Sequence, residues 1–150
     1  MGYSHSWTRP QALDIGLCNA AAEDCRQVCE ASGVPLKGIE GSPNPLFAGS
    51  IVAFDGGCEW FVVQCKCDSA SPERPMRSKP GWHVGFCKTE HLPYDICVQA
   101  CLIVFNHCFE QDFQISSDGG SAAWDRAREL CQRTLGYGSE FRLKTAGATV

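Results

Sequence analysis

Cysteine and histidine are the residues of this sequence with the widest chemistry, because both types bind metals and take part in catalysis. Cys65 and Cys67 are followed by His83, Cys87 and His91. Thiolates and imidazoles are the ligands of tetrahedral zinc sites. The spacing differs from that of a zinc knuckle, in which two residues usually separate the paired cysteines. We therefore expect neither a bound metal nor another cofactor.

Histidine beside a carboxylate is a second kind of chemistry that this chain could support. The four histidines, however, stand at no spacing that is typical of a catalytic motif. The sequence also contains no Gly-rich phosphate loop, no H-E-x-x-H and no G-x-S-x-G. We therefore expect a protein that is not an enzyme. The alternative is a small secreted hydrolase whose site is assembled from distant residues, with His83 or His107 beside an acid.

The cysteines are unusually numerous, 11 in 150 residues. This density approaches that of disulfide scaffolds, and disulfides persist in oxidising compartments. We therefore expect a secreted, extracellular protein. Because no charged segment followed by an apolar one stands at the start, we expect that a secretion signal has been removed. An odd number of cysteines also leaves at least one thiol unpaired, which could join another molecule through an intermolecular disulfide.

Two groups of cysteines have mirrored spacings. The segment 18–29 reads C-x6-C-x3-C, and the segment 97–108 reads C-x3-C-x6-C. On α-helices these offsets keep the three cysteines of each group on one face. If the two helices pack antiparallel, the reversal brings together three pairs: Cys18 with Cys108, Cys25 with Cys101, and Cys29 with Cys97. The alternative is that each stripe faces a sheet and bonds elsewhere, to Cys58, Cys65, Cys67, Cys87 or Cys131.

The first half of the chain predicts a strand, a helix and a hairpin. Residues 3–7 alternate aromatic and serine side chains, which is typical of a strand with one packed face. Apolar residues at helical spacing predict a helix within 10–32, capped by Thr8 and Gln11 and ended at Gly33. The composition of 33–49 indicates a loop. The following β-branched and aromatic runs predict a hairpin that turns at 55–57.

The second half of the chain predicts a loop, two strands and two helices. The prolines of 69–81 indicate an exposed loop, and a short strand begins at Trp82. Residues 94–108 are long enough for a helix, although their β-branched residues also fit a strand. A further strand is expected at 113–116, then a helix capped by Ser121 and ended by Gly136.

The order of these elements predicts a single domain, 1–150, of the α+β class. In this interpretation an antiparallel sheet carries two or three helices, and disulfides staple the resulting α/β sandwich. The tail 137–150 is expected to be an edge strand or a flexible segment.

The segment CEWFVVQCKC, Cys58–Cys67, lies between two cysteine-bearing segments that are predicted to be helices. With that element order it resembles the cysteine-rich effectors and killer toxins of fungi. The comparison is to the virally encoded killer toxins of smut fungi and to plant-pathogen avirulence effectors, whose sheet also carries a Cys-x-Cys strand. This chain has more cysteines than such a toxin subunit usually carries. The resemblance implies a virulence or toxin-like protein that acts by binding a host or target-cell protein, without catalytic residues.

The loop 69–81 is the candidate binding region. It carries three basic residues against the single acid Glu73, in a chain whose net charge is −4. A locally positive field could steer an acidic partner, and arginine and tryptophan often anchor interfaces. The residues expected to bind are Arg74, Arg77, Lys79, Trp82 and Trp60. The alternative is that the loop is a solvated connection and that both tryptophans belong to the core.

Charge and hydropathy argue against two classes of partner. General affinity for nucleic acid leaves a basic footprint, whereas this chain is acidic overall. A membrane-spanning helix needs about 18 uninterrupted apolar residues. The longest apolar run, around 102–105, is far shorter. We therefore expect neither nucleic-acid binding nor a membrane span.

Overall fold

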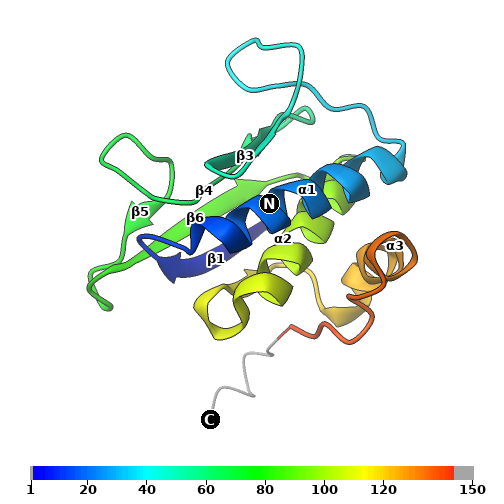
Figure 1. Ribbon diagram of the computed structural model, residues 1–150. Coiled ribbons are helices and arrows are strands. Elements are labelled where there is room, and N and C mark those ends of the chain that lie inside the picture. The colour runs from blue at the N-terminus through cyan, green and yellow to red at the C-terminus, as the bar shows by residue number, and fades with distance from the viewer. Residues whose placement is uncertain (1, 144–150) are drawn as a thin grey trace.

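The computed structural model describes residues 2–143. Within them the chain forms three α-helices and two antiparallel sheets (Figure 1), which confirms the α+β class. The elements, in chain order, are β1 (Ser4–Pro10), α1 (Ile15–Ser32), β2 (Leu46–Ala48), β3 (Ile51–Phe54), β4 (Phe61–Gln64), β5 (Arg74–Pro75), β6 (Trp82–Lys88), α2 (Asp95–Phe109), β7 (Gln114–Ser117) and α3 (Asp125–Leu135).

The larger sheet has four strands in the order β5-β6-β1-β7. Side chains of β1 alternate between a buried and a more exposed side, as the sequence predicts. Trp7 of β1 is buried and lies over Gly85 of the paired strand β6. A Cβ atom at Gly85 would lie only 2.4 Å from the indole ring. This close approach explains why a glycine interrupts the apolar strand WHVGFC.

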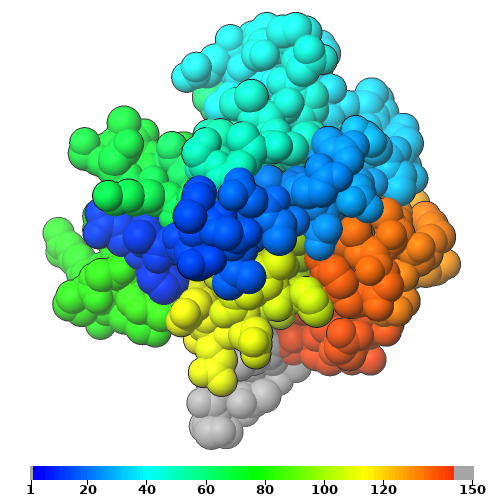
Figure 2. Space-filling view, in the orientation of Figure 1, coloured from blue at the N-terminus to red at the C-terminus, as the bar shows by residue number. Residues whose placement is uncertain are grey.

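The smaller sheet has three strands in the order β2-β3-β4. The hairpin of β3 and β4 confirms the prediction, and Asp55 stabilises its turn by accepting a hydrogen bond from Gly57 N at 2.9 Å. Residues 33–49, expected to be loop, contain the three-residue edge strand β2. A strand of three residues among prolines and glycines, which favour loops, cannot be recognised in the sequence. Figure 2 shows the segment before β2, in cyan, projecting from the body of the molecule.

Helix α1 begins later than predicted. Thr8 and Pro10, expected near its start, belong to β1. The cap is Asp14, whose carboxylate accepts a hydrogen bond from Leu17 N at 2.9 Å. The helix ends where the sequence predicts, at Gly33, which has a left-handed φ of 71°.

Helix α2 confirms the helical prediction for 94–108 and excludes the competing strand. Every residue of Cys97–Phe105 is buried, because α1, α3 and the sheet surround the helix (Figure 1). Helix α3 ends at Gly136 as expected, but a 3-10 turn, Ser121–Trp124, precedes it and Ser121 does not cap it. Within residues 2–143, none of the helices has the length and apolar character that a membrane span requires.

The segment after α3 packs on the molecule without regular secondary structure up to residue 143. Tyr137, Phe141 and Leu143 lie against the core, and the Tyr137 hydroxyl donates a hydrogen bond to Asp24 at 2.7 Å. The expected edge strand is therefore absent from 137–143. The rest of the tail, 144–150, lies outside the described residues.

Candidate functional site: a basic and aromatic surface

The predicted binding loop is in part a hairpin. Arg74 and Pro75 form β5, which pairs with β6. Met76 N donates a hydrogen bond to the Trp82 carbonyl oxygen at 2.8 Å, and Trp82 N donates to the Lys79 carbonyl oxygen at 3.1 Å. These bonds hold the backbone of the turn, which carries Arg77 and Lys79, against that of Trp82. In Figure 2 the green residues at the left include this hairpin, which reaches the surface there.

Lys79 lies on the ring of Trp82. Its Nζ atom is 3.4 Å from the ring centroid, which is within the range of a cation–π interaction. Trp82 is half-buried and Lys79 is exposed, so neither belongs to the core. A carboxylate that approaches Lys79 would therefore also meet the indole ring.

The outer side of β6 adds an aromatic residue, Phe86, that is not among the residues predicted to bind. Trp82, Val84 and Phe86 point to the same side, because side chains of a strand alternate. Phe86 is 64% exposed, and Arg74 is paired directly with Val84, so it shares this side. The alternation of β6 in the sequence is the signal that could have identified Phe86. We define the basic–aromatic surface as Arg74, Arg77, Lys79, Trp82 and Phe86.

Glu73 does not lie on this surface, contrary to the expectation from the sequence. Its side chain is 1% exposed and forms an ion pair with Arg9, 0% exposed, at 3.1 Å. The Glu73 carboxylate also accepts hydrogen bonds from Trp7 Nε1 at 2.8 Å and from Gln64 N at 3.1 Å. The one acid of the segment is thus withdrawn into the core, and it anchors the hairpin to β1 and β4.

The exposed cations of the surface carry uncompensated charge. Among residues 2–143, no carboxylate lies within 4.0 Å of the charged groups of Arg74, Arg77 or Lys79. The next acid along the chain, Asp68, accepts a hydrogen bond from Ala70 N at 2.9 Å within its own turn. The outward charge of the hairpin is therefore positive.

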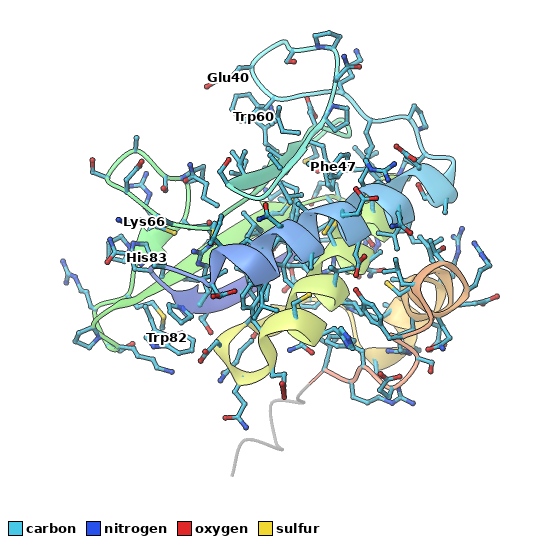
Figure 3. The ribbon with its side chains drawn as sticks, viewed as in Figure 1. Glu40, Phe47, Trp60, Lys66, Trp82 and His83 are labelled. Atoms are coloured by element: carbon cyan, nitrogen blue, oxygen red, sulfur yellow. The ribbon has the colours of Figure 1, made fainter. Side chains whose placement is uncertain are left out.

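Trp60 is not part of the basic–aromatic surface. It lies in the connection between β3 and β4 and is 43% exposed. Figure 3 shows it near Glu40 and the smaller sheet, well apart from Trp82. Trp60 and Trp82, both expected to bind, therefore do not lie on one surface. The alternative that both are core residues is wrong.

The two histidines considered for a hydrolase, His83 and His107, form no ion pair within the described part of the chain. His83 is 6% exposed, and its Nδ1 atom has no hydrogen-bond partner in the described structure. His107 is exposed and stacks on Tyr137, with ring centroids 3.6 Å apart. Among residues 2–143, neither ring forms an ion pair with a carboxylate.

His5 instead connects a serine and an aspartate. Its Nδ1 atom is 2.7 Å from Ser117 Oγ, and its Nε2 atom is 2.7 Å from Asp95 Oδ1. Ser117 lines a groove of about 1270 Å³ along β7. Its Oγ atom, however, accepts hydrogen bonds from Gly119 N at 3.0 Å and Trp124 Nε1 at 3.2 Å. With both lone pairs occupied, attack on a carbonyl would have to displace a donor, so this arrangement fits a structural network.

The residues considered as zinc ligands are dispersed. Within residues 2–143, no three histidine, cysteine or acidic side chains form a group that could hold a metal ion. Cys67 Sγ lies 3.7 Å from Glu73 Oε1, and His91 stacks on Tyr3 with ring centroids 3.6 Å apart. Cys87 Sγ contacts the Glu59 carbonyl oxygen at 3.6 Å.

All eleven cysteines are thiols in the structure. Two of the three predicted pairs bring neighbouring residues together. Cys25 Sγ lies 4.0 Å from the Cys101 carbonyl oxygen, and the Cys97 thiol has Cys29 as a neighbour. Cys29 Sγ also lies 3.6 Å from Cys101 Sγ, so which bonds form stays a prediction. The third prediction is wrong, since the Cys18 thiol has Cys65 as its neighbour in place of Cys108. The N-terminal end of α1 is held against the end of β4, where Leu13 N donates to the Cys65 carbonyl oxygen at 2.8 Å.

Burial raises the pKa of these thiols. The pKa of Cys25 is raised to about 11 and that of Cys87 to about 12, in both cases chiefly by desolvation. For Cys67, burial first and the Glu73 carboxylate second raise the pKa to about 12. Because the thiolate is the reactive form, none of these three cysteines is a nucleophile at neutral pH.

The chain cannot be placed in a family by similarity. The resemblance to fungal killer toxins and effectors therefore stays a prediction, and the arrangement of the basic–aromatic surface is what carries a functional proposal. Comparison with protein-family models, with curated proteins and with solved structures finds no match to this chain.

Proposed function

We propose that this protein is a secreted, effector-like or toxin-like protein that binds an acidic surface of a host or target-cell protein through the basic–aromatic surface. The observation that carries the proposal is the buried ion pair of Glu73 with Arg9. It removes the one acid of the segment from the surface. Arg74, Arg77 and Lys79 are thereby left as outward cations on an acidic protein.

The anchoring of the hairpin favours binding. Ordering a loop on association costs conformational entropy, so a segment that is already fixed loses less. The Glu73 contacts and the pairing of β5 with β6 fix this segment before any partner arrives. Arginine and tryptophan are also the residue types most often found as interface anchors. The basic–aromatic surface therefore combines a fixed hairpin, positive charge and exposed aromatic side chains.

Secretion and a non-catalytic role complete the proposal. Eleven cysteines favour an oxidising compartment. The resemblance to killer toxins and effectors, which depends on the segment Cys58–Cys67 between two cysteine-bearing helices, also favours a role in binding; α1 and α2 are those two helices. The hydrolase alternative gains no support from His83 and His107, which lack an acidic partner within residues 2–143.

Replacing Arg74, Arg77 and Lys79 together by serine should abolish most of the affinity for an acidic partner. A fluorescein-labelled oligo-glutamate peptide serves as the probe, and fluorescence anisotropy at low and moderate salt gives the dissociation constant. We expect the dissociation constant for the peptide to rise about tenfold or more. The melting temperature should change by less than about 4 °C, because these exposed side chains make no ion pairs in the described structure and the exposed Lys79–Trp82 contact contributes only about 0.5–1 kcal/mol.

The matched control removes three cations elsewhere: Lys37, Arg126 and Arg133, all exposed, are replaced by serine. Both variants change the net charge from −4 to −7 because each loses three positive charges. The control should retain much more affinity for the peptide than the hairpin variant. Equal losses in the two variants would show that only net charge matters, and full binding by the hairpin variant would show that the hairpin is only a connection.

A further inference from the structure

Four thiols meet where α1 packs against α2. Cys29 Sγ lies 3.6 Å from Cys101 Sγ. Cys25 Sγ lies 4.0 Å from the Cys101 carbonyl oxygen, and the Cys101 thiol has Cys25 as a neighbour. Ser32 Oγ lies 3.2 Å from Cys97 Sγ and donates to the Cys29 carbonyl oxygen at 2.6 Å, and the Cys97 thiol has Cys29 as a neighbour. The four sulfur atoms therefore follow each other in the order 25, 101, 29, 97. A bond between the middle two would leave the outer two without partners, whereas bonds 25–101 and 29–97 use all four.

A second thiol pair lies where α1 begins. Cys18 is in the first turn of the helix, and its N donates to the Asp14 carbonyl oxygen at 2.9 Å. Cys65 follows β4, and its Sγ atom is 3.3 Å from the Leu13 carbonyl oxygen. The Cys18 thiol has Cys65 as a neighbour. A bond between them would join α1 to the smaller sheet.

A third region holds Cys58 and Cys87 together. Glu59, next to Cys58, donates from its N to the Lys88 carbonyl oxygen at 3.1 Å, and Lys88 N donates to Glu59 Oε1 at 2.8 Å. Cys87, next to Lys88, has its Sγ atom 3.6 Å from the Glu59 carbonyl oxygen. A bond here would join the β3–β4 connection to β6.

We propose that these neighbours close into four disulfides, Cys18–Cys65, Cys58–Cys87, Cys25–Cys101 and Cys29–Cys97, and that Cys67 stays a thiol beside Glu73. The four bonds use eight of the eleven cysteines, and Cys108 and Cys131 belong to none of them. Each bond forms by thiol–disulfide exchange with oxidised glutathione: two protein thiols lose two protons and two electrons, and one glutathione disulfide becomes two glutathione thiols. The bonds tie together both sheets and both long helices. Cys67, 1% exposed, cannot reach another molecule, so it does not supply the intermolecular disulfide considered from the sequence.

The burial of the thiols indicates when the disulfides form during folding. A disulfide requires sulfur atoms about 2.05 Å apart, so Cys29 and the other three thiols of its group must rotate their side chains. Thiols that are already enclosed react slowly, because their thiolate forms are scarce. The bonds are therefore made during folding, before α1 and α2 close on each other.

Single substitutions test each pair in protein refolded with reduced and oxidised glutathione. Thiols are alkylated in denaturant without reduction and located by mass spectrometry. Cys18→Ala should expose Cys65 to alkylation, and Cys58→Ala should expose Cys87. The double variant Cys29→Ala/Cys101→Ala should expose Cys25 and Cys97, giving two thiols more than the wild type. Cys67→Ala is the control and should lower the thiol count by one.

Direct mapping of the wild type removes any dependence on how the variants fold. Acidic digestion without reduction, followed by electron-transfer fragmentation, should identify the same four linkages. A Cys18–Cys108 or Cys29–Cys101 linkage would overturn the proposed pairing. An unchanged thiol count in Cys29→Ala/Cys101→Ala would do the same, and so would a wild type in which all eleven cysteines are alkylated.

Discussion

Reduction of the disulfide-bonded protein should remove most of its stability. Each bond that closes a long loop contributes about 2–4 kcal/mol, so four bonds contribute about 8–16 kcal/mol. The whole free energy of unfolding of an ordinary domain is about 5–15 kcal/mol. We therefore expect the melting temperature, followed by circular dichroism, to fall by at least about 15 °C when reductant is added.

The variant Cys67→Ser is the matched control for this experiment. It removes the thiol that lies beside Glu73 and leaves the four proposed bonds in place. Reductant should therefore lower its melting temperature as much as that of the wild type. If the native protein melts at the same temperature with and without reductant, its cysteines are largely thiols, and the interpretation as a secreted protein is wrong.

Local patterns predicted most of the helices and strands. The alternation along β1 and the glycine that ends α1 depend on neighbouring residues only, so they are visible in the sequence. The strand β2 is not, because its three residues are defined by pairing with β3. The start of α1 cannot be predicted locally for a similar reason: pairing with β6 and β7 draws Thr8 into β1.

The candidate site was predictable in its charges but not in its shape. Arg74, Arg77 and Lys79 are evident from composition. The burial of Glu73 is not, because its partner Arg9 lies 64 positions away in the sequence. The exposure of Trp60 could be predicted, but its distance from Trp82 could not, because that distance depends on how the two sheets are arranged. Contacts between distant segments decide both cases.

The buried ion pair of Glu73 with Arg9 should be among the most sensitive points of the fold. Glu73→Gln retains the shape of the side chain and an oxygen for Trp7 Nε1, but it leaves the Arg9 charge buried without a counter-charge. Removing one partner of a buried pair costs about 3–5 kcal/mol. We therefore expect a much lower midpoint of urea unfolding. The amides of Met76 and Trp82, which close the hairpin, should also exchange faster with deuterium.

The control for this variant is Glu30→Gln on the surface of α1. Glu30 pairs with Arg26 at 2.8 Å, but its side chain is 64% exposed, so water screens the pair and the midpoint should hardly move. Arg9→Met should destabilise as Glu73→Gln does, and Arg9→Met/Glu73→Gln should cost clearly less than the two single changes together, since no unpaired charge remains. Strictly additive costs would mean that the two side chains act independently. The ion pair would then not be what holds Glu73 away from the basic–aromatic surface.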